Sequence, residues 1–102
     1  MPAISDAQIE RVRALVAAIP PGRVATYGDI AAAATLSSPR IVAWIMRTDS
    51  HDLPWHRVIR ASGVPAAHIA SRQVELLRAE GVLARDGRVP LAQLRHSFQP
   101  GF

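Results

Sequence analysis

"RVATYGDIAAAATLSSPRIVAWIMR", residues 23–47, carries two helix start signals separated by a short polar break. Thr26 can cap the first helix, and Asp29 follows three residues later in the manner of a capping box. Ser38 can cap the second helix, with Pro39 at its first position, where the missing amide hydrogen costs nothing. Two short helices joined by a tight turn predict a helix-turn-helix.

Further helices flank this motif on both sides. Apolar residues at helical spacing follow a cap at Ser5 or Asp6, and a Pro-Pro-Gly run ends that helix. Gly81 is placed to end a later helix, and an Asp-Gly pair at 86–87 predicts a hairpin turn. The expected helices cover residues 6–19, 27–34, 39–47 and 72–82, with a short one within 91–98. The expected fold class is mainly α: one small winged-helix-like helix-turn-helix domain over residues 1–102, with a short C-terminal β-hairpin.

The helix that begins at Pro39 has two different faces. Ile41, Val42, Ile45 and Met46 fall on one side and are expected in the core. Arg40, Ala43, Trp44 and Arg47 fall on the other side and are expected to face outward. This outward face is basic, which fits either an ordinary solvated surface or a contact with an anionic partner.

Composition limits the classes of function. Basic residues outnumber acidic ones by 12 to 8, and the net charge of +4 permits an anionic partner without requiring one. The sequence has no cysteine, which excludes disulfides, thiolate metal sites and thiol nucleophiles. No signal peptide or membrane-spanning run is visible, so we expect a soluble, cytoplasmic protein without a membrane partner.

The segment from Asp49 to Ala70 is irregular, ordered or disordered, and holds the residues best suited to chemistry. His56 could act as a base towards Ser50, Ser62 or water, but no catalytic or nucleotide-binding motif surrounds it. A structural histidine inside a loop is the more common situation. The four histidines lack metal-ligand spacing, so we expect no metal and no cofactor.

Four motifs then occur in one order: "IPPGRVATYGDIA" (19–31), "PRIVAWIMR" (39–47), "PWHRVI" (54–59) and "LLRAEGV" (76–82). Together they resemble the DNA-binding domain of the O6-alkylguanine-DNA alkyltransferases. In that family the third motif reads P-C-H-R-V, and its cysteine accepts the alkyl group from damaged guanine. Trp55 stands at that position here. The chain therefore resembles the alkyltransferase-like proteins, which bind O6-alkylguanine in DNA without repairing it and pass the lesion to nucleotide excision repair.

The resemblance implies a role for each matching residue. It assigns DNA contacts to Tyr27, Arg40, Ala43 and Arg47, and the alkylguanine pocket to Tyr27, Pro54, Trp55 and Val58. His68, 13 positions after Trp55, is a further candidate for the pocket, and a solvated loop histidine is the alternative. Within these, Tyr27 would help rotate the nucleotide outward, and Arg40 would fill the space that the base leaves. His56 and Glu80 match the pair that activates the cysteine in the active relatives, and without a thiol they are expected to remain as a structural hydrogen-bonded pair. Arg57 is expected to tie down its own loop.

The resemblance also implies how the chain meets DNA. The helix over 39–47 would enter the minor groove of double-stranded DNA carrying O6-alkylguanine, where sequence discrimination is weak. The partners implied are this DNA and nucleotide excision repair proteins, and we expect a monomer. Two other functions stay open: a helix-turn-helix transcription regulator without lesion preference, and a DNA-repair enzyme that uses His56 and Glu80.

Overall fold

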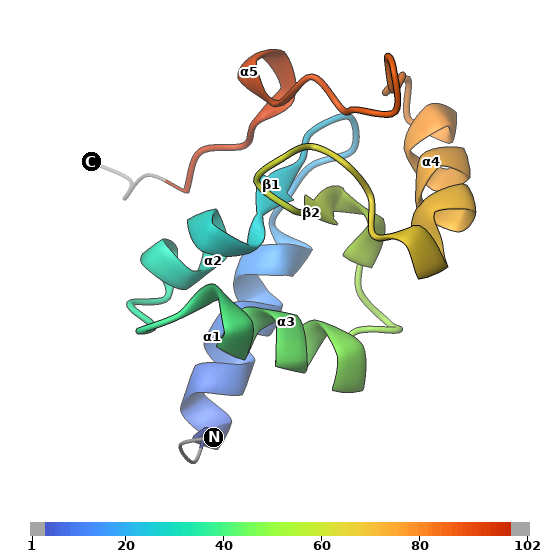
Figure 1. The fold of residues 1–102 in the computed structure, drawn as a ribbon. Helices are drawn as coiled ribbons and strands as arrows, with labels where there is room; N and C mark the ends of the chain where they lie inside the picture. Colours follow the sequence, from blue (N-terminus) through green and yellow to red (C-terminus); the bar gives the residue numbers. More distant parts are fainter. Residues whose placement is uncertain (1–3, 99–102) are drawn as a thin grey trace.

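The structure is a computed structural model that describes residues 4–98. Its α-helices are α1 (Asp6–Ala17), α2 (Tyr27–Ala33), α3 (Pro39–Thr48), α4 (Ala70–Ala79) and α5 (Leu91–Leu94), with 3₁₀ helices η1 (Trp55–Arg57) and η2 (Ala67–Ile69). The fold class is mainly α, as expected, and α2 and α3 form the helix-turn-helix (Figure 1). The Asp49–Ala70 segment is ordered by local turns and the two 3₁₀ helices rather than left as open loop.

The helix starts lie where the capping residues predict them. Thr26 accepts a hydrogen bond from the Asp29 amide, and the Asp29 carboxylate accepts one from the Thr26 amide, which closes a capping box. Ser38 accepts from the Arg40 amide and is followed by Pro39 at the first helical position. These caps satisfy amides that the helix itself leaves without partners, and so they fix where α2 and α3 begin.

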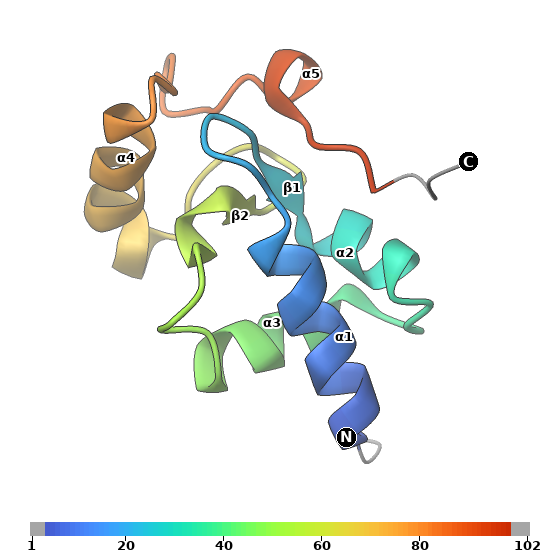
Figure 2. The same cartoon turned by 180° about the vertical axis from the view of Figure 1, so that it is seen from behind.

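A short parallel sheet, which the sequence did not reveal, joins two distant parts of the chain. Strands β1 (Ala25–Thr26) and β2 (Val58–Ile59) pair in register, Ala25 with Val58 and Thr26 with Ile59. The strand pair lies between the α1–α3 group and α4 (Figures 1 and 2). Because the residue after β1 begins α2, the sheet sets the start of α2 beside the segment that follows η1.

The expected C-terminal β-hairpin is reduced to its turn. Asp86 and Gly87 both have positive φ, as a type I′ turn requires, and one antiparallel bridge joins Arg85 to Arg88. No strand extends from this bridge within residues 4–98. The physical reason is that the next hydrogen-bonded pair of the hairpin would be Leu83 with Pro90, and Pro90 has no amide hydrogen to donate. The amide of Val89 points away from the opposite arm and donates to the carbonyl of Gly63 at 2.8 Å.

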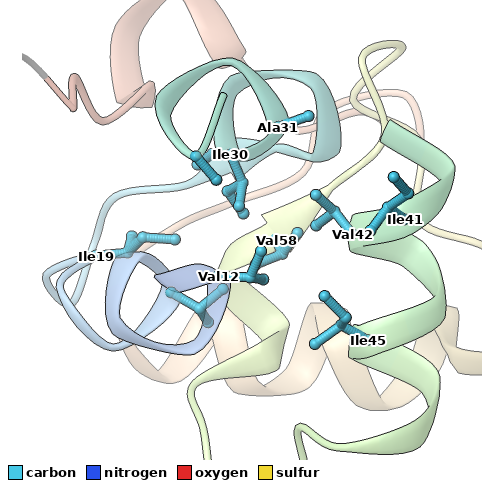
Figure 3. Close-up of a cluster of buried hydrophobic side chains, with 11 residues drawn as sticks. Val12, Ile19, Ile30, Ala31, Ile41, Val42, Ile45 and Val58 are labelled. Atoms are coloured by element: carbon cyan, nitrogen blue, oxygen red, sulfur yellow. The ribbon is translucent and has the colours of Figure 1, made fainter. Parts of the chain in front are cut away.

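Two clusters of buried side chains form the core. The larger one brings together α1, α2, α3 and β2, through residues such as Val12, Ile30, Ile45 and Val58 (Figure 3). The smaller one contains Ile59 with α4 and the residues after it. Val58 and Ile59 therefore face opposite clusters, because successive side chains of a strand point to opposite sides.

Two residues of α3 differ from their expected faces. Trp44, expected on the outward face, is half-buried and packs against the larger cluster. Its helical position lies next to that of Ile41, so the large ring can turn towards the core at the boundary between the two faces. Met46, expected in the core, is half-buried at the opposite boundary and also lines a cavity.

Among residues 4–98, the helices are too short and too polar for any of them to span a lipid bilayer.

Candidate functional site

A cavity of about 750 Å³ opens between α3, the first residue of α2, η1 and the segment around η2. It is lined by six residues that the sequence had singled out for DNA or lesion contact, namely Tyr27, Arg40, Ala43, Arg47, Trp55 and His68. These residues come from four separate parts of the chain. The fold thus brings side chains from the first three motifs, together with His68, to one cavity.

Two residues expected in the pocket do not line it. Val58 is only 1% exposed and belongs to the larger core cluster, so its side chain cannot contact a ligand in the cavity. Pro54 precedes η1, and its carbonyl accepts the Arg57 amide at 3.0 Å. Both residues instead hold the segment that carries Trp55.

Trp55 is half-buried at the start of η1 and lines the cavity. Its amide donates to the Leu53 carbonyl at 2.7 Å, and its carbonyl accepts from the Val58 amide. The indole stands edge-on to the ring of His56, with centroids 6.2 Å apart and planes at 90°. An aromatic wall fixed by its own backbone bonds suits a flat apolar ligand.

Glu80, just after α4, receives hydrogen bonds from three different groups. His56 Nε2 lies 2.7 Å from Glu80 Oε2, and Arg57 Nη2 lies 2.6 Å from the same oxygen. Arg57 Nε and the Gly22 amide donate to Glu80 Oε1, at 3.0 and 3.2 Å. Because a carboxylate only accepts, Nε2 of His56 carries the hydrogen of this contact.

This network holds Glu80 in its charged form. The hydrogen bonds from Arg57 are the largest cause, burial opposes them, and His56 adds to them, so that the pKa of Glu80 falls from 4.5 to about 2. The remaining Arg57 nitrogen donates to the Ile19 carbonyl at 2.8 Å. Arg57 therefore ties its loop to α1's end and to α4's end, as the sequence suggested.

Gln73 is a positioning residue that sequence reasoning missed. It is 1% exposed, and its side-chain amide donates to the carbonyls of His56 at 3.0 Å and Val58 at 2.9 Å. It thus fixes both ends of the segment that follows Trp55. A glutamine within a polar helix gives no periodic signal of this kind, so only its burial distinguishes it from a surface residue.

The segment after β2 is held close to the cavity by Arg60 and Gly63. Arg60 Nε donates to the Val64 carbonyl at 3.0 Å, and Nη2 donates to the Pro65 carbonyl at 3.1 Å. Gly63 has a φ of 76°, and a Cβ there would come within 2.7 Å of the Val89 carbonyl oxygen. A side chain at position 63 would therefore displace the wall that leads to His68.

The cavity is positively charged. Arg40, Arg47 and Arg60 line it together with two histidines, and none of its lining residues within 4–98 is acidic. Burial raises the pKa of Tyr27, while Arg60 and Arg47 lower it in part, so its phenol stays neutral and can donate a hydrogen bond. Phosphate oxygens would find both charge and donors at this opening.

Within the described part of the chain, no group of three or more histidine and acidic side chains is arranged to hold a metal ion.

Comparison with known proteins agrees with this arrangement. Residues 7–82 match the model of the 6-O-methylguanine DNA methyltransferase DNA-binding domain. A DNA base-flipping protein of Escherichia coli is 37% identical over 101 residues, which cover 91% of this chain and 77% of the relative. The chain belongs to the family of the 6-O-methylguanine DNA methyltransferase DNA-binding domain.

Solved structures place the chain with the alkyltransferase-like proteins within the family. S. pombe Atl1 bound to damaged DNA containing O6-carboxymethylguanine matches with a TM-score of 0.79 at 29% identity, over 96% of this chain and 100% of Atl1. The O6-methylguanine methyltransferase of Mycobacterium tuberculosis in complex with DNA matches with a TM-score of 0.65 at 30% identity, over 78% of this chain and 51% of that one. This chain thus shares its fold with about half of the larger methyltransferase.

Proposed function

We propose that the chain binds double-stranded DNA containing O6-alkylguanine, takes the flipped base into the cavity, and leaves the alkyl group in place. The observation that carries this proposal is the cavity itself, which combines an indole wall at Trp55 with a rim of arginines. The base-flipping relative and the Atl1 complex support the same activity. A base must leave the duplex before any pocket can enclose it.

With Trp55 at this position, the site is suited to holding an alkylated base and not to reacting with its alkyl group. An indole has no nucleophile to attack the alkyl carbon, and the chain contains no cysteine that could replace it. The ring can instead pack against the alkyl group or the base, which is worth about 1–3 kcal/mol per base. The chain therefore acts as a binding protein and not as an alkyl acceptor.

The residues around the opening would drive the flip. Arg40 is exposed at the start of α3 and can enter the duplex, where its guanidinium stacks on bases and meets the orphaned partner. Tyr27, at the start of α2, would crowd the neighbouring phosphate. Ala43 leaves room for α3 in the minor groove, and Arg47 would contact a phosphate. His68, exposed in η2, would add a polar contact to the bound base.

The wider setting follows from this role. A protein that leaves the lesion unrepaired must pass it on, and nucleotide excision repair proteins are the partners we propose. A monomer suffices, because isolated lesions lack the two-fold symmetry that favours dimeric readers. Such a protein would act on chromosomal DNA in the cytoplasm.

We expect Arg40→Ala to reduce the affinity for a duplex with one O6-methylguanine by about tenfold, because the vacated base position then loses its stacking partner. Fluorescence anisotropy of a labelled duplex, with and without the lesion at fixed salt, measures this change. Arg72→Ala is the matched control, since Arg72 is exposed on α4 and does not line the cavity. Equal losses for both variants would mean that only net charge matters, and equal binding of both duplexes by the native chain would favour a general DNA-binding regulator.

An enzyme that uses His56 and Glu80 is the competing function, because the pair lies within hydrogen-bonding distance. Arg57 holds Glu80 in its weakly basic, charged form, which makes it a poor proton acceptor at neutral pH. Mass spectrometry of alkylated DNA after incubation separates the two functions. An intact base and alkyl group support binding alone, whereas loss of either would establish an enzyme.

A further inference from the structure

Arg13 of α1 reaches across to the loop that follows α3, here called the rim loop (residues 49–53). Its Nη1 donates to the Asp49 carbonyl at 2.7 Å and to Asp52 Oδ1 at 3.0 Å, while Nη2 donates to Asp52 Oδ2 at 2.5 Å. A further contact of 3.2 Å joins Nη1 to Asp49 Oδ1. One guanidinium therefore binds both acidic side chains of the rim loop and its backbone.

This contact differs from an ordinary surface ion pair. The Arg13 side chain is only 20% exposed, although Asp49 and Asp52 are about half exposed. The bond to the Asp49 carbonyl involves the residue that caps the C-terminal end of α3. Isolated exposed ion pairs contribute little to stability because both side chains lose conformational freedom. The guanidinium of Arg13 instead binds several groups of one loop at once, a contact here called the fork, and so it fixes the position of that loop.

The rim loop forms part of the cavity. Ser50 and His51 line it, and the Ser50 hydroxyl donates to the Met46 carbonyl in the last turn of α3. At the other end, the Leu53 carbonyl accepts from the Trp55 amide. A shift of the rim loop would therefore change the opening of the cavity and also move the indole.

From these contacts we propose that Arg13 is a positioning residue: it holds the rim loop against the cavity and so sets the size of adduct that the cavity grips. This inference rests on the proposed lesion-binding function. Asp49 and Asp52 are both negative and lie near the C-terminal end of α3, where the helix dipole is also negative. Without Arg13 the rim loop loses the hydrogen bonds that tie its backbone and both carboxylates to α1, and it moves outward.

The test is Arg13→Gln, with binding measured to duplexes that carry no lesion, O6-methylguanine or O6-benzylguanine. We expect affinity for the methyl adduct to fall by about fivefold, since a small group needs the loop close by. Affinity for the benzyl adduct should change by less than about twofold, because the larger group still reaches the displaced wall. A role in general stability alone would lower the two affinities equally.

Two further variants separate position from charge. Arg13→Gln combined with Asp52→Asn restores the net charge of +4 but not the fork, so it should keep the loss for the methyl adduct. Arg11→Gln removes a neighbouring charge on α1, and it should leave the ratio of the two adducts unchanged. Within residues 4–98 the Arg11 side chain makes one long hydrogen bond, 3.5 Å to the Ala33 carbonyl.

The outcomes distinguish the two proposals. Recovery of methyl-adduct binding in the double variant, or the same change in Arg11→Gln, would overturn the role of Arg13 while lesion binding by the native chain stands. A native chain that binds all three duplexes alike would overturn the proposed function itself. Circular dichroism checks that each variant is folded. A further variant, Arg13→Lys, keeps the positive charge at position 13 but cannot form the forked contact. An intermediate loss in this variant supports the role of the fork, and native behaviour contradicts it.

Discussion

We expect Glu80→Gln to lower the free energy of unfolding by about 3 kcal/mol at pH 7. The carboxylate accepts from Arg57, His56 and the Gly22 amide, and its pKa falls from 4.5 to about 2 in the folded chain. A shift of that size corresponds to roughly 3 kcal/mol of stabilisation of the charged form. The Glu80 side chain is 15% exposed, so solvent screens this interaction only weakly.

The sign of the pH dependence follows from the lowered pKa. The unfolded chain takes up a proton on Glu80 at a higher pH than the folded chain does, so acid favours unfolding. The stabilisation is complete above the unfolded pKa of about 4.5 and is lost as the pH falls towards 2. Urea unfolding at pH 7 and pH 3 should show the difference between native chain and variant shrinking by about half.

Glu75→Gln is the matched control for this measurement. Glu75 also lies on α4 and pairs with an arginine, but its side chain is 72% exposed and the distance to Arg72 is 3.5 Å. We expect this variant to lose no more than a few tenths of a kcal/mol, roughly the value of an exposed helical pair. A loss at Glu80 that is equally small, or that does not change with pH, would contradict the structural role of the network.

The second large effect is expected at Trp55. Trp55→Ala should weaken binding of a duplex containing O6-methylguanine by about tenfold to a hundredfold, because the cavity loses its aromatic wall. Binding to the undamaged duplex should change by less than about threefold, because phosphate contacts dominate there. Anisotropy titrations on both duplexes measure the ratio directly.

Trp44→Phe provides the control for loss of an indole. Trp44 packs against the larger core cluster, and it is not among the residues that line the cavity. This variant should bind both duplexes like the native chain, whereas Trp55→Phe should keep part of the lesion preference. A Trp55→Ala variant that retains the full preference would place the base elsewhere and reject the cavity as its site.

Local signals account for much of what the sequence predicted. The caps at Thr26 and Ser38 act within three residues of themselves, so the starts of α2 and α3 could be placed without knowledge of the rest of the fold. The parallel β1–β2 pair could not be predicted in this way, because each strand has two residues and its partner lies more than thirty positions away. Strands that short carry no periodic pattern, and only tertiary packing selects them.

The site shows the same division between local and distant causes. The motifs indicated Trp55 and Arg40, which the fold brings to one cavity. Val58 was misplaced because a motif position says nothing about which way a strand residue points. Gln73 and Arg13 were missed because their significance lies in carbonyls and carboxylates of remote segments. Such contacts depend on how the elements pack, and the spacing of residues within a single helix does not predict them.

The β1–β2 pair also has a consequence for motion. Thr26 caps the helix that begins at Tyr27, and its strand partner Ile59 follows the turn that begins at Trp55. The two aromatic walls of the cavity are therefore joined through backbone hydrogen bonds in buried surroundings, which open only on slow timescales. Amide hydrogen exchange should accordingly find the two walls protected together, so that a base enters between walls that stay still.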